Sequence, residues 1–423
     1  MLTTGLSTAE RVLTRCQTLA RFSEDREGTR RTFLSAPMRD CYREVSEWLA
    51  AVGVSARVDA AGNLRGLYPG ASPEAPRLLI GSHLDTVPNA GAYDGILGVT
   101  LAAALLEGLE GRRLPFAIEV VGFSEEEGVR FGRPFIGSRA LVGRLDDDLL
   151  DCCDAQGVSV RRAIEDFGLQ LAEIPRARLG ADVLGYLEFH IEQGPVLEDL
   201  GLALGAVDTI AGQSRLEFTF AGRANHAGTT PMHLRHDALA GAAEWIVAVE
   251  NAAEVAVGTS KGLVATVGFL DVKPGAVNCI AGQVRASLDV RHASNEIRKS
   301  TVMDLVQRAH EIARRRELHF SSKTLLDQGA VAMDTFFVAQ IAEAMRNVGC
   351  QPHRMISGAG HDAMILAEQV PAAMIFVRTP GGVSHDPSET VQAADIAKAI
   401  ACGTQLLEQL AVSREFLTRV GRA

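Results

Sequence analysis

The stretch GSHLDTVPNAGAYDGILG, residues 81–98, decides the fold of this chain. It follows the apolar run RLLIG (residues 77–81), which indicates a buried strand, and it leads into the apolar residues 96–106, which predict a helix. A strand, a loop and a helix in this order form the repeating unit of an open α/β sheet with helices on both faces. Ligands of such sheets bind outside the carboxyl ends of the strands, where this loop lies.

A second acidic stretch, FSEEEGVRFG (residues 123–132), follows another apolar strand, FAIEVVGF (residues 116–123). The two stretches place imidazole and carboxylate side chains at one edge of the predicted sheet: His83, Asp85, Asp94, Glu125, Glu126 and Glu127. Taken singly, an HxD pair or a run of glutamates is more often a solvated loop than a binding site. Because both stretches follow buried strands, we interpret the set as half of a two-metal site.

The spacing suggests roles within this set. If the strand continues past residue 81, His83 and Asp85 share a face, so His83 can bind a metal while Asp85 holds its ring from behind. Asp94 lies where the loop passes into the helix, and a carboxylate there can bridge two cations. Glu126 and Glu127 are adjacent and should point apart, so that one binds metal while the other faces substrate.

Two further histidines lie in polar segments interrupted by Gly or Pro, His190 in YLEFHIEQGPVLE and His385 in MIFVRTPGGVSHDPSE. We expect them to complete the metal site. Imidazole and carboxylate ligands without thiolate suit Zn, Mn, Co or Ni. A carboxylate-bridged pair of such ions lowers the pKa of a bound water to about 7, and a glutamate beside that water can serve as general base.

Composition and charge exclude several classes of function. The chain has 423 residues, 47% hydrophobic and 22% charged, as expected for a soluble globular protein of two domains. A net charge of −10 without a basic stripe argues against a nucleic-acid partner. The N-terminus lacks a signal-peptide core and no apolar run is long enough to span a bilayer, so we expect a cytoplasmic protein that does not bind membranes. The seven cysteines are scattered without a CxxC pair, which argues against a disulfide framework.

The pattern predicts a catalytic α/β domain at residues 1–212 and 328–423, interrupted by a second domain at residues 213–327. The inserted part predicts strands at residues 215–224, 263–272, 283–292 and 318–326 and helices at residues 237–256 and 295–317. This βαββαβ order is that of a ferredoxin-like sandwich. His385 follows the insertion, so segments from both sides of it must close the metal site. A domain inserted between ligand-bearing halves is well placed to act as a lid.

At these residues the chain resembles the M20 metallopeptidase superfamily, in particular the hydantoinase/carbamoylase branch of allantoate amidohydrolases and N-carbamoyl-L-amino-acid hydrolases. The resemblance covers nearly the whole chain. It is carried by the motifs GSHLDTV, YDG, EEEGVRF, HIEQGPVLE, NHAGTTPM, PGAVNCIAGQVRASLDVR, SGAGHDA and GVSHDPSE.

The resemblance implies a site with two divalent ions per subunit. His83, Asp94 and His190 would bind one ion. Asp94, Glu127 and His385 would bind the other, with Asp94 bridging the two. Glu126 would be the general base, and Asp85 would assist as a further catalytic residue.

The resemblance also implies roles for residues that composition alone would leave on the surface. His226 in NHAGTTPM would reach the active site of the neighbouring subunit in a homodimer and stabilise the oxyanion. Asn278 and Arg291 would bind a substrate carboxylate, with Arg291 as a bidentate clamp. Gln193, Gln213 and His361 are further candidate substrate contacts, and Asp362 beside His361 is also explained as a helix cap.

Three functions are compatible with these features. The first is hydrolysis of the ureido C–N bond of a small carboxylate, with allantoate, a purine breakdown product, as first choice. An N-carbamoyl-L-amino acid, or the substrate of a β-ureidopropionase, is the alternative. The second is a peptidase or deacylase of the same superfamily, against which HIEQGP and NHAGTTPM argue. The third is an inactive ligand-binding homologue, which would be expected to have lost a metal ligand or the base, whereas all are present here.

Overall fold

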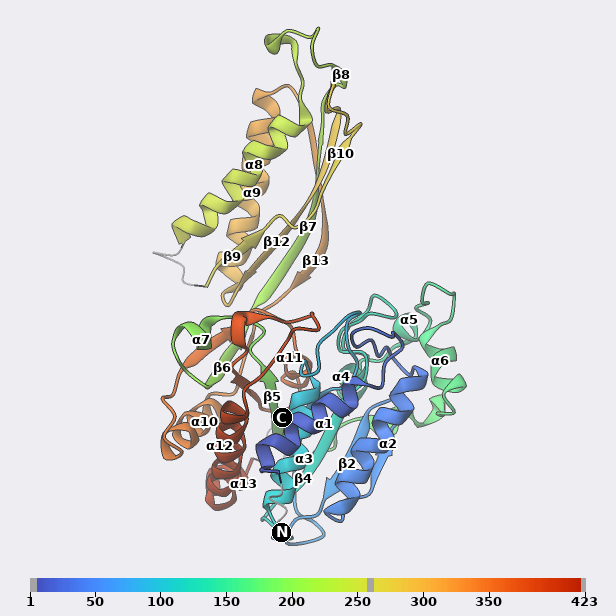
Figure 1. Ribbon diagram of the computed structural model, residues 1–423, viewed down its shortest axis with the longest axis vertical. Helices are drawn as coiled ribbons and strands as arrows, with labels where there is room; N and C mark the ends of the chain where they lie inside the picture. The colour runs from blue at the N-terminus through green and yellow to red at the C-terminus, as the bar shows by residue number, and fades with distance from the viewer. Residues whose placement is uncertain (1–5, 257–261, 420–423) are drawn as a thin grey trace. The chain divides into compact units, whose positions relative to one another are not determined.

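The computed structural model describes residues 6–256 and 262–419 (Figure 1). Its backbone forms two compact units. Unit 1 comprises Met1–Asp208, Met333–Met355 and Gly360–Ala423, and unit 2 comprises Thr209–Ala332 and Ile356–Ala359. Unit 2 thus extends a few residues beyond the predicted insertion at both ends, and it includes a short later segment that the sequence did not indicate. The first five residues, on which the expectation about the signal peptide partly rests, lie outside the described residues.

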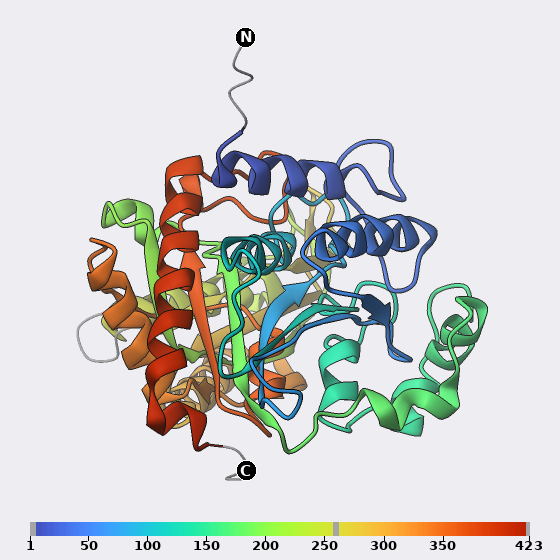
Figure 2. The same ribbon diagram turned by 90° about the horizontal axis from the view of Figure 1, so that it is seen from below.

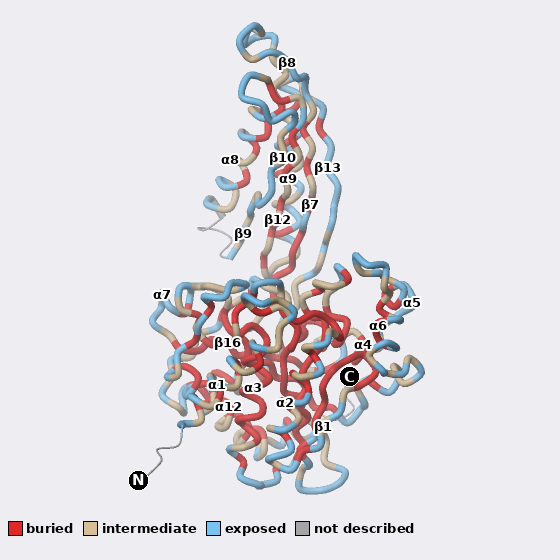
Figure 3. Tube along the Cα trace, turned by 45° about the vertical axis from the view of Figure 1, so that its right-hand side comes forward, coloured by how far each residue is buried: buried red, intermediate tan, exposed pale blue. Residues whose placement is uncertain are grey.

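Unit 1 is built on a mixed sheet with strand order β1-β2-β4-β3-β5-β16-β6-β14, and β15 pairs with β6; of this sheet, β14 and the last two residues of β6 and of β15 belong to unit 2. The strands are β1 (Ala56–Val58), β2 (Leu64–Tyr68), β3 (Arg77–His83), β4 (Ala117–Phe123), β5 (Val183–Ile191), β6 (Leu204–Ile210), β14 (Val331–Ala332), β15 (Arg354–Ser357) and β16 (Ala372–Val377). The central strands β4, β3, β5 and β16 are parallel. Their residues are almost all buried (Figure 3), as expected for a parallel sheet covered on both faces.

One face of this sheet carries most of the helices of unit 1. They are α1 (Thr8–Ala20), α2 (Ala36–Ala51), α3 (Ile96–Gly108), α10 (Thr335–Asn347), α12 (Ala393–Val412) and α13 (Arg414–Leu417). Figure 2 shows the teal α3 below the dark-blue α1 and to the right of the red α12. Helix α3 is buried through most of its length, because its apolar residues surround it on all sides. Helix α1 begins with a capping box formed by Ser7 and Glu10.

The opposite face of the sheet is covered by shorter elements. Successive side chains of β5 point to alternate faces and so contact different helices. Leu187 and Phe189 belong to the core beneath α3, whereas Glu188 accepts a hydrogen bond from the backbone of Ala363 in α11 (Asp362–Leu366). The other short elements of unit 1 are α4 (Ile136–Leu141), α5 (Asp147–Leu150), α6 (Val160–Asp166), η1 (Leu171–Ala177), α7 (Val196–Asp199) and η3 (Pro380–Gly382). The predicted mixed α/β fold is confirmed. None of the described helices combines the length and the apolar character needed to cross a bilayer.

Unit 2 is an antiparallel sheet with two long helices. The sheet order is β10-β12-β7-β13, and β9 also pairs with β12. The elements are β7 (Gly212–Ala221), β8 (Asn225–His226), η2 (Met232–Leu234), α8 (Ala238–Ala256), β9 (Val264–Thr266), β10 (Leu270–Lys273), β11 (Cys279–Ile280), β12 (Gln283–His292), α9 (Asn295–Arg315) and β13 (His319–Gln328). Alternate residues of β7, Leu216, Phe218 and Phe220, form the core with Trp245 of α8.

The prediction of one continuous strand at residues 263–272 is wrong, because the structure has two strands there, β9 and β10. Between them, the backbone N–H of Phe269 donates to the hydroxyl of Ser287 (3.0 Å), and its carbonyl accepts from the backbone N–H of Ser287 (3.1 Å). A side chain thus replaces one backbone partner, and the ladder is interrupted at this point.

Candidate metal centre

The candidate ligands of unit 1 gather at the carboxyl ends of the parallel strands. His83 is the last residue of β3, His190 lies near the end of β5, and Glu127 follows β4. Asp94 stands in the loop before α3. His385 follows β16, which lies after the insertion in the chain. The sheet order places β3 between β4 and β5, and β5 beside β16, so neighbouring strands deliver these side chains to one place.

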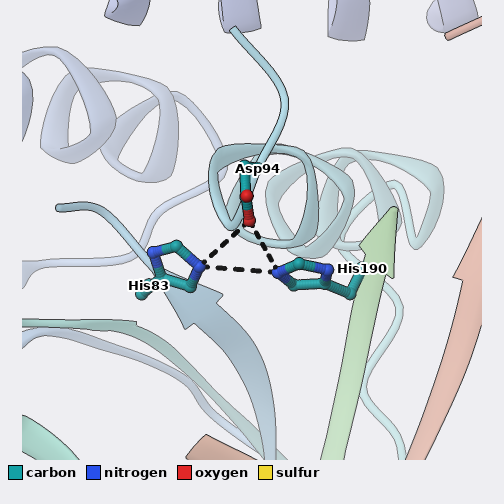
Figure 4. Close-up of side chains that lie close together, drawn as sticks. All are labelled: His83, Asp94 and His190. Atoms are coloured by element: carbon teal, nitrogen blue, oxygen red, sulfur yellow. Dashed lines mark hydrogen bonds and ion pairs between the residues drawn. The ribbon is translucent and has the colours of Figure 1, made fainter. Parts of the chain in front are cut away.

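His83, Asp94 and His190 form one group of candidate ligands (Figure 4). Oδ1 of Asp94 lies 3.1 Å from Nε2 of His190 and 3.4 Å from Nε2 of His83. The two Nε2 atoms are 3.4 Å apart. All three side chains are almost completely buried.

The hydrogen bonds of the two rings show which nitrogen is available. Nδ1 of His83 lies 2.9 Å from the backbone carbonyl of Asp85, and Nδ1 of His190 lies 2.9 Å from that of Ile191. Because a carbonyl only accepts, each Nδ1 carries the proton, and the Nε2 of a neutral ring then presents a lone pair. Oδ1 of Asp94 has no hydrogen-bond partner among the described residues. When both rings are neutral, three electron-rich atoms face one another, an arrangement that suits a cation.

A second group shares Asp94. Nε2 of His385 lies 3.2 Å from Oδ2 of Asp94 and 3.6 Å from Oε1 of Glu127. The two groups thus use different oxygens of one carboxylate. A third group, with ligand atoms within 4.8 Å of one another, joins His83, Glu126 and Glu127. These groups contain only imidazole and carboxylate donors, and such donors fit Zn, Mn, Co or Ni.

The structure corrects the position expected for Asp85. Strand β3 ends at His83, so the two residues do not share a strand face. The carboxylate of Asp85 is 3.8 Å from Nδ1 of His83, whereas the backbone carbonyl of the same residue is the ring's partner. The two carboxylate oxygens accept from the backbone N–H groups of Glu126 (3.0 Å) and Glu127 (3.1 Å). The carboxylate of Asp85 therefore orients the acidic segment, and the imidazole of His83 is held by the backbone carbonyl of Asp85.

The three glutamates after β4 have different surroundings. Glu125 accepts from the backbone N–H groups of Phe33, Arg130 and Phe131, so it has a structural role. Burial raises the pKa of Glu126 well above its usual value, with the like charge of Glu127 adding to the shift. Burial, together with the like charge of Asp94, raises the pKa of Glu127 to about 7.

Three residues form hydrogen bonds with Asp94, and the sequence did not predict this role for any of them. Gln193 donates through Nε2 to Oδ2 of Asp94 (2.8 Å), and Ser384 donates to the same oxygen (3.0 Å). Glu389 accepts from the backbone N–H groups of Tyr93 (2.8 Å) and Asp94 (3.1 Å). The polar residues of HIEQG and GVSHDPSE were the available signal, but only the folded chain brings them to Asp94.

Two of these loops contain a left-handed residue that is not glycine. Gln193 has φ 58°, and His385 also has φ 58°. Such conformations cost free energy and persist where the surrounding contacts hold them, which is common at functional sites.

His361, a predicted substrate contact, is buried beside the metal ligands. Its ring centroid lies 4.6 Å from that of His190 in an edge-to-face arrangement. Burial lowers the pKa of His361 well below its usual value, and the neighbouring His190 adds to the shift, so the ring is neutral. His361 also belongs to a fourth group of candidate metal ligands, together with Glu188 and His190. The neighbouring Asp362 has no hydrogen-bond partner for either oxygen among the described side chains and backbone.

In unit 2, the short pair of β8 and β11 links His226 to Asn278. His226 pairs with Cys279, and the carbonyl of Asn278 accepts from the backbone N–H of Ala227 (2.9 Å). The backbone N–H of Gly228 donates to Nδ1 of His226 (3.1 Å). The neutral ring therefore carries its proton on Nε2, which makes this exposed side chain a hydrogen-bond donor.

Arg291 and Gln213 stand opposite each other on β12 and β7. Arg291 donates twice to Asp289 (2.9 and 3.0 Å) and once to the carbonyl of Gly358 (2.7 Å). Two of its five N–H groups remain for another partner. Gln213 donates to the side chain of Gln328 (3.0 Å).

A parallel-centred α/β sheet with imidazoles and carboxylates at its carboxyl edge fits a metal-dependent hydrolase. The model of Peptidase family M20/M25/M40 matches residues 79–409, and the chain belongs to this family. The resemblance inferred from the sequence motifs is therefore confirmed, and so is the prediction of a hydrolase.

Relatives of two kinds are similar over most of the chain. An N-carbamoyl-L-amino acid amidohydrolase of Geobacillus stearothermophilus is 39% identical, covering 88% of this chain and 90% of its own. Allantoate deiminase 2 of Glycine max is 36% identical, covering 90% of this chain and 85% of its own. Among solved structures, an amidase of the hydantoinase/carbamoylase family from Burkholderia multivorans is 28% identical with a TM-score of 0.89, covering 97% of this chain and 98% of its own.

Proposed function

We propose that this chain is a two-metal amidohydrolase that cleaves a ureido C–N bond of a small carboxylate, with allantoate as the first choice of substrate. The observation that carries the proposal is the arrangement of His83, Asp94 and His190, whose acceptor atoms face one another at 3.1 to 3.4 Å. These three residues would hold one cation, and Asp94, Glu127 and His385 would hold a second, with Asp94 common to both sets. The bound ions would activate a water molecule and polarise the ureido carbonyl.

Glu126 is the general base of this mechanism. Glu127 belongs to two groups, one of them with Asp94 and His385, whereas Glu126 belongs only to the group with His83 and Glu127, and we assign the proton transfer to Glu126. It takes a proton from the attacking water and returns it to the leaving nitrogen. That return is needed because amide and ureido nitrogens are poor leaving groups. Asp85 assists by holding the backbone of both glutamates.

Unit 2 is a ferredoxin-like lid and dimerisation domain in this proposal. His226 enters the site of the neighbouring subunit and donates from Nε2 to the oxygen that gains negative charge. Its tautomer, set by the backbone N–H of Gly228, supports that role. Arg291 and Asn278 bind the substrate carboxylate, with Gln213 and His361 as further contacts. Gln193, bound to Asp94, orients the bridging ligand.

The choice between two substrates depends on the group beside the reacting ureido carbon. Allantoate carries a second ureido arm, and N-carbamoyl-L-amino acids carry a side chain there. The motifs GQSR, HAGTTP and SGAGHDA favour allantoate, and FVRT (residues 376–379) favours the amino acids. A relative that is 39% identical bears the amino-acid name, so we retain that activity as the second candidate.

One preparation tested on both substrates decides between them. We expect ammonia release from allantoate with a specificity constant up to roughly 10⁴-fold above that for N-carbamoyl-L-methionine, because a site built to hydrogen-bond a group rejects analogues that lack it. The opposite preference overturns the choice of substrate. Metal content near two ions per chain with no release from either compound, from N-carbamoyl-β-alanine or from a dipeptide points to an inactive homologue.

A further inference from the structure

Glu389 is the last residue of the segment GVSHDPSE, which carries His385. Its side chain is buried against the loop that contains Asp94. Its Oε1 accepts from the backbone N–H groups of Tyr93 (2.8 Å) and Asp94 (3.1 Å). We infer that Glu389 is a positioning residue that fixes Asp94 relative to His385 and so sets the affinity of the second metal position. The inference rests on the metal site of the proposed function.

Ser384 provides a second connection between the same two loops. Its hydroxyl lies 3.0 Å from Oδ2 of Asp94 and 3.4 Å from Oε2 of Glu389. Glu389 therefore holds the backbone of Asp94, while Ser384 holds its carboxylate. Ser384 and Glu389, on either side of His385, thus hydrogen-bond Asp94 at its carboxylate and at its backbone, although they lie almost 300 positions away in the chain.

The packing around Gly91 leaves no room for a side chain beside Glu389. A Cβ atom at Gly91 would lie 2.5 Å from Cβ and 2.7 Å from Oε1 of Glu389. Gly91 therefore allows Glu389 to reach Asp94. A side chain at position 91 would displace the carboxylate without altering it chemically, which offers an independent way to break the contact.

The two metal positions depend on this contact to different degrees. His83 and His190 stand on β3 and β5, and the ladders to the next strands fix them, since His83 pairs with Phe123 of β4 and His190 with Phe376 of β16. His385 lies in a loop, in a left-handed conformation, and its distance to Asp94 depends on neighbouring contacts. Partners of metal ligands are typically worth about 10- to 100-fold in metal affinity. The second position should lose this amount when Glu389 is removed, and the first should lose less.

The test is titration of the metal-free protein with Zn²⁺, resolved into two dissociation constants, without any substrate. Glu389→Ala should weaken the second by at least about 10-fold. Glu389→Gln, which keeps the accepting oxygen, should bind like the unchanged protein. Glu389→Asp, which keeps the charge but shortens the reach, and Gly91→Ala, which displaces the carboxylate, should both resemble Glu389→Ala.

Glu192→Ala is the matched control. Glu192 is also buried and also accepts two backbone N–H groups, from Val196 (2.7 Å) and Leu197 (3.0 Å), but it does not contact Asp94. It should lower the unfolding temperature while leaving both dissociation constants unchanged. This comparison separates a loss of stability from a loss of ligand position.

Two results overturn the inference. One is an unchanged second dissociation constant in Glu389→Asp and Gly91→Ala, both of which remain measurable if Glu389→Ala does not fold. The other is a weak second site in Glu389→Gln with a normal one in Glu389→Asp, which would make charge and not position the cause. If the unchanged protein binds fewer than two ions, the metal site of the proposed function fails instead.

Discussion

The Nε2 atoms of His83 and His190 lie 3.4 Å apart, and each ring donates through its other nitrogen to a backbone carbonyl. Oδ1 of Asp94 lies beside them, buried and without a hydrogen-bond partner among the described residues. Buried polar groups without a partner are costly, so a bound cation should stabilise the fold as well as supply the chemistry.

Removal of metal should therefore affect both activity and stability. We expect exhaustive chelation to abolish ammonia release and to lower the unfolding temperature, and Zn, Mn, Co or Ni to restore both. Asp94→Ala should lose both ions because its two oxygens face different groups. Elemental analysis and thermal unfolding measure these effects. Full activity in protein shown to be free of metal would rule out the mechanism.

Adjacent glutamates should give different losses. Glu126→Gln should keep two ions per chain and lose about 10³- to 10⁴-fold in kcat, because an amide cannot transfer the proton. Glu127→Gln should instead lose one ion. Metal content and turnover, measured on the same samples, distinguish the two variants. Wild-type turnover in Glu126→Gln would move the base to another carboxylate.

Gly95 should tolerate no side chain. Its φ is 69°, and a Cβ atom there would lie 2.4 Å from the His83 ring. Gly95→Ala should cost about 1–2 kcal/mol from the backbone alone and displace a metal ligand in addition. Gly108→Ala, in the last turn of the same helix, meets no neighbouring atom and should be neutral or slightly stabilising. Denaturant unfolding and metal content check both variants, and equal behaviour would contradict the prediction.

Mixed dimers should report on His226. If its ring serves the neighbouring subunit, inactive His226→Ala and inactive Glu127→Ala chains should together regenerate activity, because one site of the heterodimer then carries both intact groups. Separately tagged chains allow the heterodimer to be isolated and assayed. A verified heterodimer without activity would place His226 in the site of its own subunit or outside the chemistry.

Arg291 should matter for every carboxylate substrate. A hydrogen-bonded charge pair contributes about 1.5–3 kcal/mol, so Arg291→Ala should lower kcat/KM by roughly 10- to 150-fold for allantoate and N-carbamoyl amino acids alike. Arg285→Ala on the same strand is the control, since Arg285 pairs with Glu217. A comparable loss in the control would indicate a general effect on unit 2.

Much of this molecule follows from the sequence. Apolar strands that end in HLD and SEEEG predict an α/β sheet with a polar carboxyl edge, because burial and periodicity are properties of short segments. Residue types in these and later segments predict His83, Asp94, His190, His385 and one of the adjacent glutamates as candidate ligands, and the family resemblance selects Glu127. Family membership followed from the motifs and was confirmed by comparison.

Only the tertiary structure decided how those side chains meet. The carboxylate of Asp85 was predicted to orient His83, yet it holds the backbone of Glu126 and Glu127 while the carbonyl of Asp85 holds the ring, because β3 ends two residues too early for a shared strand face. Likewise Glu389 reaches Asp94 across almost 300 positions of chain. A hydrogen bond depends on angstrom-scale geometry set by packing between distant segments, and local patterns in a sequence carry no record of it.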